Sequence, residues 1–175
     1  MKVVFLDIDG VLQPYDADNW FALLDKKMIN NLSKKFNVDY SKYGINSVSS
    51  VYYDWDEQAV LRLKYILDET GSKIIMSSDL RSNDNVYKLR DLLKMHYLGD
   101  YWYSDNAILK VGNNPVERRA LEIKDYLNKY SIDNYVVLDD MWEIKNYFPN
   151  NTVITYNSIS IDNMNECIKI LKRKK

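Results

Sequence analysis

The chain opens with VVFLDIDGVL at residues 3–12, and this stretch carries the strongest structural signal in the sequence. Its apolar part, Val3–Leu6, is rich in β-branched and aromatic residues, which predicts a buried strand. Two carboxylates, Asp7 and Asp9, follow at once, and Gly10 opens a turn. Ionised carboxylates are costly at the end of a buried strand unless a cation neutralises them, and Mg²⁺ prefers such oxygen ligands. The stretch therefore predicts a metal-binding strand end or, as the simpler alternative, a strand that ends in an Asx turn.

Three further segments place polar side chains in a fixed order along the chain. Two hydroxyls, Ser77-Ser78, follow a short apolar strand predicted at Ile74–Met76. Two bases, Arg118-Arg119, open a helical stretch, and two acids, Asp139-Asp140, end the apolar run Tyr135–Leu138. Open α/β sheets bind their ligands at the carboxyl ends of the strands, so the acids and hydroxyls are expected to meet at one edge.

This order of acid, hydroxyl, base and acid pair resembles the haloacid dehalogenase (HAD) superfamily of phosphotransferases, which use an aspartate nucleophile. The resemblance covers about residues 2–142, and its first and fourth motifs are the specific ones. The chain departs from the usual pattern in having Arg instead of Lys as the base of the third motif. Four stretches look most like the small HAD domains associated with RNA-repair proteins: Phe5–Leu12, Ile74–Arg81, Arg119–Leu127 and Val136–Asp140.

The resemblance implies roles for the first two motifs. Asp7 is expected to attack phosphorus and form an aspartyl phosphate, with Mg²⁺ offsetting the repulsion between carboxylate and phosphate. Asp9 is expected to bind the metal through its backbone carbonyl and to act as general acid and base through its side chain. Ser77 is expected to donate a hydrogen bond to a phosphoryl oxygen, from a strand end just before a helix N-terminus. Ser78 and Arg81 are further candidates for binding the phosphate or the substrate.

The third and fourth motifs each leave a choice. Arg119 is expected to neutralise the charge that develops on the phosphate, and the Arg-x-x-Glu-Ile register favours it over Arg118. Of the acid pair, Asp140 is expected to bind the metal directly and Asp139 to act behind it or through a water. The alternative for the pair is an N-cap for a helix over Met141–Phe148, which explains one aspartate more easily than two.

Strand and helix signals alternate along the chain, which predicts a three-layer, Rossmann-like α/β fold with a mainly parallel sheet. We expect one HAD-like domain over residues 1–175, with a small flap or cap insert at about 13–54. Within this insert, a helix is expected over 20–36 and a Ser- and Tyr-rich loop over Tyr40–Tyr53. Elsewhere, strands are expected at 2–8, 73–77, 101–104, 135–139 and 152–156, and helices at 56–70, 84–95, 115–130 and 160–173.

For several other side chains, the sequence allows a structural role as well as a functional one. Arg81 can contact a substrate phosphate or base, or it can pair with Asp79 or Asp84 on a helix surface. His96 is the single histidine, which leaves no material for a histidine triad or zinc site, and it is expected at the surface or as a cap. Three aromatic residues are expected to pack against the insert, with a substrate-facing role as the alternative: Trp20, Tyr52 and Tyr53.

Composition excludes several classes of protein. With 46% hydrophobic and 13% aromatic residues, the chain of 175 residues is globular rather than disordered. Its formal charge of −1, from 24 basic and 25 acidic residues, creates no strong field toward nucleic acid or membranes. A single cysteine, Cys167, excludes an intramolecular disulfide and a cysteine-built metal site. No signal peptide or membrane span is evident, so the cytoplasm is the expected location.

The leading functional hypothesis is a Mg²⁺-dependent phosphomonoester hydrolase that acts on a nucleotide or on the terminal phosphate of a nucleic acid. That substrate class rests on the resemblance and on the short insert, since small-cap HAD phosphatases have open sites, and no base-recognition motif supports it. A phosphorylated small metabolite is the alternative substrate if the Tyr40–Tyr53 loop closes. A non-catalytic or regulatory phosphate-binding module is the alternative function, and the complete set of motif residues argues against it. The sequence identifies no protein partner.

Overall fold

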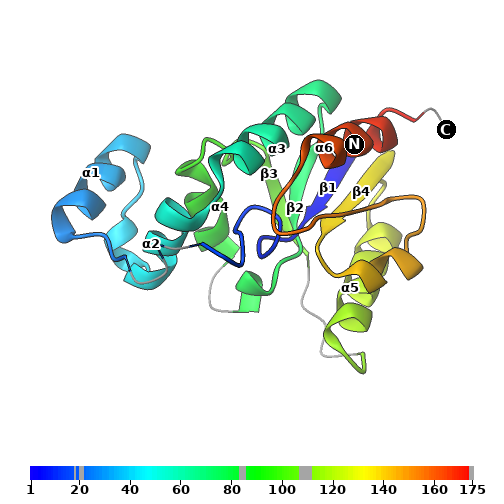
Figure 1. Ribbon diagram of the computed structural model, residues 1–175, viewed down its shortest axis with the longest axis horizontal. Helices are drawn as coiled ribbons and strands as arrows, with labels where there is room; N and C mark the ends of the chain where they lie inside the picture. The colour runs from blue at the N-terminus through cyan, green and yellow to red at the C-terminus, as the bar shows by residue number, and fades with distance from the viewer. Residues whose placement is uncertain (18, 20–21, 83–85, 107–111, 174–175) are drawn as a thin grey trace.

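The computed structural model describes residues 1–17, 19, 22–82, 86–106 and 112–173. Its centre is one sheet of five parallel strands in the order β3-β2-β1-β4-β5 (Figure 1). Every strand predicted from the sequence is present, with ends that differ by one or two residues. The strands are β1 (Lys2–Leu6), β2 (Lys73–Met76), β3 (Trp102–Asp105), β4 (Asn134–Asp139) and β5 (Thr152–Ile154).

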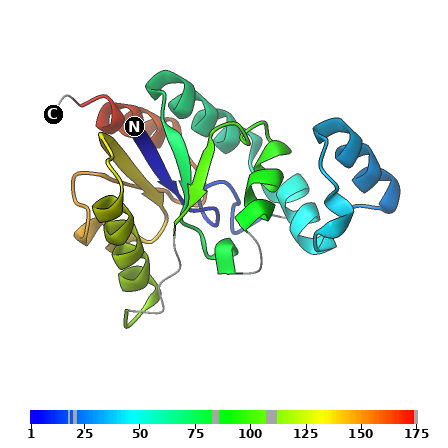
Figure 2. The same cartoon turned by 180° about the vertical axis from the view of Figure 1, so that it is seen from behind.

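Helices lie on both faces of this sheet, so the predicted three-layer α/β architecture is confirmed (Figures 1 and 2). The α-helices are α1 (Lys26–Phe36), α2 (Ile45–Asp54), α3 (Glu57–Thr70), α4 (Val86–Lys94), α5 (Pro115–Lys129) and α6 (Ile161–Leu171). Short 3₁₀ helices are η1 (Tyr40–Lys42), η2 (Asp79–Ser82) and η3 (Trp142–Asn146). Within the described part of the chain, no helix combines the length and the apolar character needed to span a bilayer.

Alternation along the strands sends side chains into two separate cores. In β1, Val4 and Leu6 join the core formed with α3, α4 and α6, whereas Val3 and Phe5 join the core formed with α5. Strands buried on both faces are almost continuously apolar, which explains the strength of the sequence signal. Because all the strands run in the same direction, their carboxyl ends meet at one edge of the sheet.

Two helices begin or end where the sequence indicates. The helix α3 begins after Asp56, whose side chain accepts a hydrogen bond from the Gln58 amide at 2.8 Å, and it ends at Gly71 with a φ of 64°. Glycine suits this left-handed conformation because it has no Cβ. Pro115 lies in the first turn of α5, where its missing N–H costs nothing. This start places Arg119 in the second turn of α5, over the sheet.

The insert after the first motif is more helical than the sequence predicted. The loop prediction for Tyr40–Tyr53 is wrong, because η1 and α2 occupy this stretch. Val48 and Val51 are buried along α2, so a weak helical spacing was hidden among serines and tyrosines. The helix expected over 20–36 is α1, which begins later, after the cap Asp25; the first two positions of that prediction lie outside the described residues.

The insert packs against the end of α4. The Tyr40 hydroxyl donates to the Asp91 carbonyl at 2.8 Å. His96, expected at the surface or as a cap, is half-buried: its ring stacks on Trp55 with centroids 4.9 Å apart, and its Nε2 lies 2.7 Å from the Val51 carbonyl oxygen near the end of α2. Burial lowers the pKa of His96 and so favours the neutral ring. Figure 1 shows α1 and α2 at the end of the molecule away from α5.

Candidate active site

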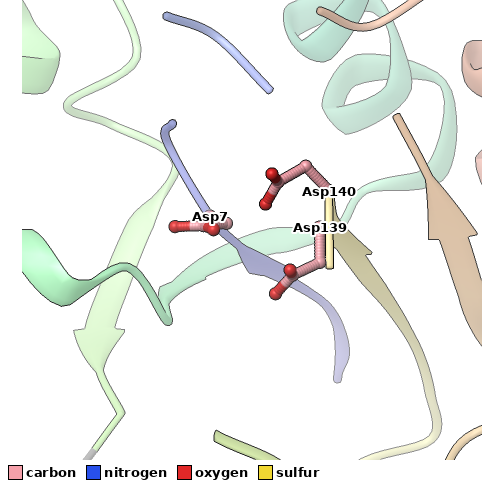
Figure 3. A group of neighbouring side chains, drawn as sticks. All are labelled: Asp7, Asp139 and Asp140. Carbon is pink, nitrogen blue, oxygen red and sulfur yellow. The ribbon is translucent and has the colours of Figure 1, made fainter. Parts of the chain in front are cut away.

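The carboxyl ends of β1 and β4 bring three carboxylates together. Asp7 directly follows β1, while Asp139 ends β4 and Asp140 follows it (Figure 3). The two strand ends are adjacent, since the Asp7 amide donates to the Leu138 carbonyl at 3.1 Å. One oxygen from each of the three carboxylates lies within 4.8 Å of the others. The first and fourth motifs therefore meet at the expected edge of the sheet.

A buried arginine joins two of these carboxylates. Nη1 of Arg119 donates to Asp7 at 2.5 Å and to Asp139 at 2.7 Å. Arg118, one residue earlier, is half-buried and pairs with the exposed Asp79 at 2.9 Å. Successive helical residues are rotated by about 100° around the axis, so neighbouring side chains cannot both face the same carboxylates. The structure thus places Arg119, the residue favoured by the sequence register, at the aspartates.

Burial dominates the protonation of this cluster. It raises the pKa of Asp7, although Arg119 and the Ile8 amide at 2.8 Å act in the opposite direction. It also raises the pKa of Asp139 to about 6 against the same opposing Arg119. Burial by itself lowers the pKa of Arg119, but the charges of Asp139 and Asp7 outweigh it and raise that pKa. A single guanidinium therefore does not fully compensate the buried negative charge.

The cluster suits a divalent cation. Its donor set is entirely carboxylate oxygen, which a hard cation such as Mg²⁺ prefers, and Mg²⁺ completes its shell with waters. Both oxygens of Asp139 already accept hydrogen bonds, one from Arg119 and one from the Met141 amide at 3.0 Å. Asp140, in contrast, has one oxygen, Oδ1, that forms no hydrogen bond with any described residue. This difference favours Asp140 as a direct ligand, with Asp7 beside it and Asp139 more strongly tied to the protein.

The capping alternative for the acid pair applies only in part. The Asp139 side chain does accept from the Met141 amide, two residues ahead. The helix expected over Met141–Phe148 is, however, the shorter 3₁₀ helix η3, and Met141, the residue at its N-cap, makes no side-chain cap. Since Asp139 also binds Arg119, capping does not account for the pair.

Tyr15 is a neighbour of the site that the sequence analysis missed. Its hydroxyl donates to Oδ2 of Asp140, and its amide donates to the Asn157 side chain at 2.7 Å. Both Tyr15 and Asp140 pack closely on Gly10, where an added Cβ would lie 2.9 Å from each of them. Gly10 also has a φ of 67°, so it is suited to this turn in two ways. No sequence motif marks Tyr15; only the folded turn brings it to Asp140.

Asp9 lies outside the group of three carboxylates. The residue is exposed, but its carboxyl group is partly shielded by neighbouring atoms. This shielding, followed by the negative charges of Asp7 and Asp140, raises the pKa of Asp9. An acid that keeps its proton closer to neutral pH is better suited to general acid catalysis.

The two serines of the second motif have different surroundings. The Ser77 amide donates to the Leu6 carbonyl at 2.8 Å, which places Ser77 level with the residue after β1. Its hydroxyl is buried and has no hydrogen-bond partner among the described residues. Ser78 directly precedes η2, and its hydroxyl accepts a hydrogen bond from the Leu80 amide at 3.3 Å. Ser77 therefore presents the free hydroxyl, and the helix expected directly after it is the 3₁₀ turn η2.

Arg81 has a buried partner that the sequence analysis did not consider. Its Nη2 forms an ion pair with Glu122 of α5 at 2.8 Å, and both side chains are almost fully buried. It also donates to the Ser77 carbonyl at 3.1 Å and to the Asn106 carbonyl at 2.7 Å. Through these contacts Arg81 links β2, β3 and α5, and its role in binding a phosphate or the substrate stays a prediction. The only sequence signal was the glutamate three residues after Arg119.

Of the three aromatic residues that were expected to pack against the insert, the structure describes Tyr52 and Tyr53. Tyr53 is half-buried, and its hydroxyl lies 3.8 Å from the Met28 sulfur within the insert. Tyr52 lines a cavity of about 620 Å³, together with His96 and residues of α3, and none of the site carboxylates lines this cavity. Trp20, the third aromatic considered, lies outside the described residues.

Comparison with known proteins agrees with this geometry. Residues 3–163 match the family described as the HAD domain in Swiss Army Knife RNA repair proteins, and this range includes all four motif segments. Comparison with curated proteins and comparison with solved structures each gave no significant match. The chain therefore belongs to the HAD superfamily, as a hydrolase- or phosphatase-type domain of the kind found in Swiss Army Knife RNA-repair proteins.

Proposed function

We propose that this protein hydrolyses phosphomonoesters with Mg²⁺ through an aspartyl phosphate, and that the phosphate lies at the end of a nucleotide or nucleic acid. One observation carries the proposal: the buried Asp7 carboxylate, held by Arg119 beside Asp139 and Asp140. A strand that merely ended in an Asx turn would need neither a buried arginine nor two further aspartates. The arrangement instead combines a nucleophile, a cation and ligands for a metal.

In the first step, an Asp7 carboxylate oxygen forms a bond to phosphorus while the bond from phosphorus to the ester oxygen breaks. The leaving oxygen takes a proton from Asp9, whose raised pKa favours the protonated acid. Arg119 and the unpaired Ser77 hydroxyl donate to the phosphoryl oxygens as charge develops there. When bound among the carboxylates, Mg²⁺ supplies the charge that offsets repulsion between Asp7 and the phosphate.

In the second step, a water molecule attacks the phosphorus of the aspartyl phosphate. The Asp9 carboxylate accepts the proton of this water, and the bond from phosphorus to Asp7 breaks. Inorganic phosphate leaves, and Asp7 returns to the carboxylate form that Arg119 binds. Because Asp9 handles a proton in both steps, its substitution slows formation and breakdown of the intermediate alike.

The family description, which names RNA repair, supports a phosphorylated nucleic-acid end as the substrate. The exposure of Asp9 supports an opening that admits such an end. The formal charge of −1 provides no general attraction to a nucleic-acid strand, so recognition of the terminal phosphate itself accounts better for binding. A phosphorylated small molecule remains the competing substrate class, and the test below separates the two.

The test measures phosphate release in Mg²⁺ from a panel of phosphomonoesters. The panel contains an aryl phosphate, nucleoside 3′- and 5′-monophosphates, sugar phosphates, and oligonucleotides phosphorylated at the 3′ or 5′ end. Asp7→Asn serves as the inactive variant and Arg118→Met as the matched active control, because Arg118 pairs with Asp79 at the surface. We expect release that requires Mg²⁺ and Asp7 and that is fastest with an oligonucleotide end.

Each outcome has a clear meaning. Faster release from sugar phosphates than from oligonucleotides would show that the substrate is a phosphorylated small molecule and would leave the proposed mechanism unchanged. Turnover that survives Asp7→Asn or chelation by EDTA would overturn the mechanism. Folded wild-type protein that binds inorganic phosphate but releases none from any substrate would favour the non-catalytic binding module.

A further inference from the structure

An asparagine at the end of β3 has a buried side chain without partners. Asn106 directly follows β3 and is only 3% exposed. Neither its Oδ1 nor its Nδ2 has a hydrogen-bond partner among the described residues. Buried polar groups are nearly always paired, because an unpaired one loses its hydration without compensation. An amide with both atoms unpaired therefore indicates a missing ligand.

The backbone places this asparagine level with the nucleophile. The Asn106 amide donates to the Met76 carbonyl at 2.8 Å, and the Ser77 amide donates to the Leu6 carbonyl at 2.8 Å. In a parallel ladder, these bonds pair Asn106 with Ser77 and Ser77 with Asp7. The three residues thus form one row across the carboxyl ends of β3, β2 and β1.

The three side chains of this row leave the sheet on the same face. Two residues earlier on their strands, Phe5 and Ile75 pack in the core under α5. Ser104 reaches the same side, because its hydroxyl lies 2.8 Å from that of Tyr126 in α5. Since side chains alternate with a period of two, Asn106 points to the face from which Arg119 approaches the carboxylates.

Arg81 fixes the main chain at this end of the row. Its guanidinium donates to the Asn106 carbonyl at 2.7 Å and to the Ser77 carbonyl at 3.1 Å. It is itself held by the buried Glu122 at 2.8 Å. The main chains of Asn106 and Ser77 are therefore fixed by backbone bonds, while the Ser77 hydroxyl and the Asn106 amide remain unpaired.

We propose that Asn106 and Ser77 together form a subsite for phosphoryl oxygens, with Nδ2 of Asn106 and the Ser77 hydroxyl as donors. The proposal rests on the phosphatase function proposed above and adds a residue to its binding site. A singly protonated phosphate offers an acceptor oxygen and a hydroxyl donor, which match Nδ2 and Oδ1 of one amide. Donors that are already positioned and dehydrated bind such an anion without reorganisation.

The test compares Asn106→Leu and Asn106→Asp with Ser104→Ala. The control Ser104→Ala changes the same face of β3 two residues earlier but keeps the amide. Inorganic phosphate is titrated calorimetrically into each Mg²⁺-loaded protein, and kcat/KM is measured with the best panel substrate. We expect both Asn106 variants to bind phosphate and to turn over substrate about 10- to 100-fold less well, the loss typical of one hydrogen bond to a charged group.

Stability separates a binding role from a structural one. Asn106→Leu removes two unpaired buried atoms, so its thermal midpoint should match or exceed that of the wild type. A lower midpoint in Asn106→Leu, with phosphate affinity unchanged in Asn106→Asp, would show that the amide serves the fold and would overturn the subsite. Phosphate affinity and kcat/KM within twofold of the control in both variants would also overturn the subsite. A buried water would then be the hydrogen-bond partner of the Asn106 amide.

The failure of this subsite and the failure of the proposed function are distinguishable. If the wild type releases phosphate in an Asp7-dependent way and the Asn106 variants equal the control, only the subsite is wrong. If the wild type has no activity but binds inorganic phosphate, and the Asn106 variants weaken that binding, the subsite stands without the phosphatase.

Discussion

The substitution Arg119→Met tests whether the central arginine neutralises a buried acid cluster. Arg119 is 5% exposed and donates to Asp7, 4% exposed, and to Asp139, 1% exposed. Removal of one partner from a buried ion pair costs about 3–5 kcal/mol, because the remaining charge is left dehydrated. Protonation limits this cost, since burial already raises the pKa of Asp139 to about 6. We therefore expect a loss of about 4 kcal/mol at pH 8 and a smaller loss at pH 5.

The assay is thermal and urea-induced unfolding in EDTA at these two pH values. For a chain of this length, a loss of that size lowers the thermal midpoint by roughly 10 °C. The matched control is Arg118→Met, which removes a partly exposed pair with Asp79 worth about 0–1 kcal/mol and a longer contact with Glu122 at 3.9 Å, while Arg81 still pairs with Glu122. Arg119→Lys keeps the charge but cannot present the planar fork of a guanidinium, so it should fall between the two.

Magnesium supplies a second measurement on the same proteins. A cation bound by the carboxylates stabilises the native state by about 2.7 kcal/mol at one hundred times its dissociation constant. It should therefore recover part of the stability that Arg119→Met loses. Equal unfolding midpoints for Arg119→Met and Arg118→Met in EDTA, at both pH values, would refute the reasoning that Arg119 neutralises the cluster.

Three further expectations concern the same strand ends. Burial places the pKa of Asp139 at about 6, above the unfolded value of about 4, so the native state holds the extra proton between these values. In EDTA, this carboxyl should therefore lower the free energy of unfolding by up to about 3 kcal/mol as pH rises from 4 to 7. The measurement compares urea unfolding of the wild type with that of Asp139→Asn across this pH range. An equal pH dependence of the free energy of unfolding in the two proteins would contradict this expectation. Gly10→Ala should lower the stability by about 1–3 kcal/mol and weaken Mg²⁺ binding, because its φ is 67° and its Cβ would meet Asp140 and Tyr15 at 2.9 Å; an unchanged calorimetric Mg²⁺ titration would count against this packing. Tyr15→Phe, which removes the hydroxyl that orients Asp140, should weaken Mg²⁺ by about 10-fold with little change in unfolding, and unaltered affinity would show that this orientation is unimportant.

The strands were predictable because their signal is local. The strands β1, β2 and β4 each contain a short apolar run that is buried on both faces, and polar residues come at the carboxyl end of each run. The insert was less predictable for the same reason. In α2, Val48 and Val51 mark the buried side among serines and tyrosines, so the helical period is weak and the stretch was wrongly predicted as a loop.

The sequence also located the segments that supply the candidate site. Asp7 and the acid pair follow apolar runs, and parallel strands must bring such ends to one edge. Between Arg118 and Arg119, the local register favoured the residue that the structure places at Asp7. These placements were accessible from the sequence because each depends on neighbours within a few positions along the chain.

Partners that are distant in the sequence could be found only in the tertiary structure. Arg81 pairs with Glu122 across 41 positions, and the Tyr15 hydroxyl meets Asp140 across 125. Asn106 joins the level of Asp7 only through the register of three strands. The sequence alone thus determined which strands end in chemical groups, because burial and periodicity are local. Only the fold decided which of those groups are neutralised, oriented or left unpaired, because these properties depend on the space around each side chain.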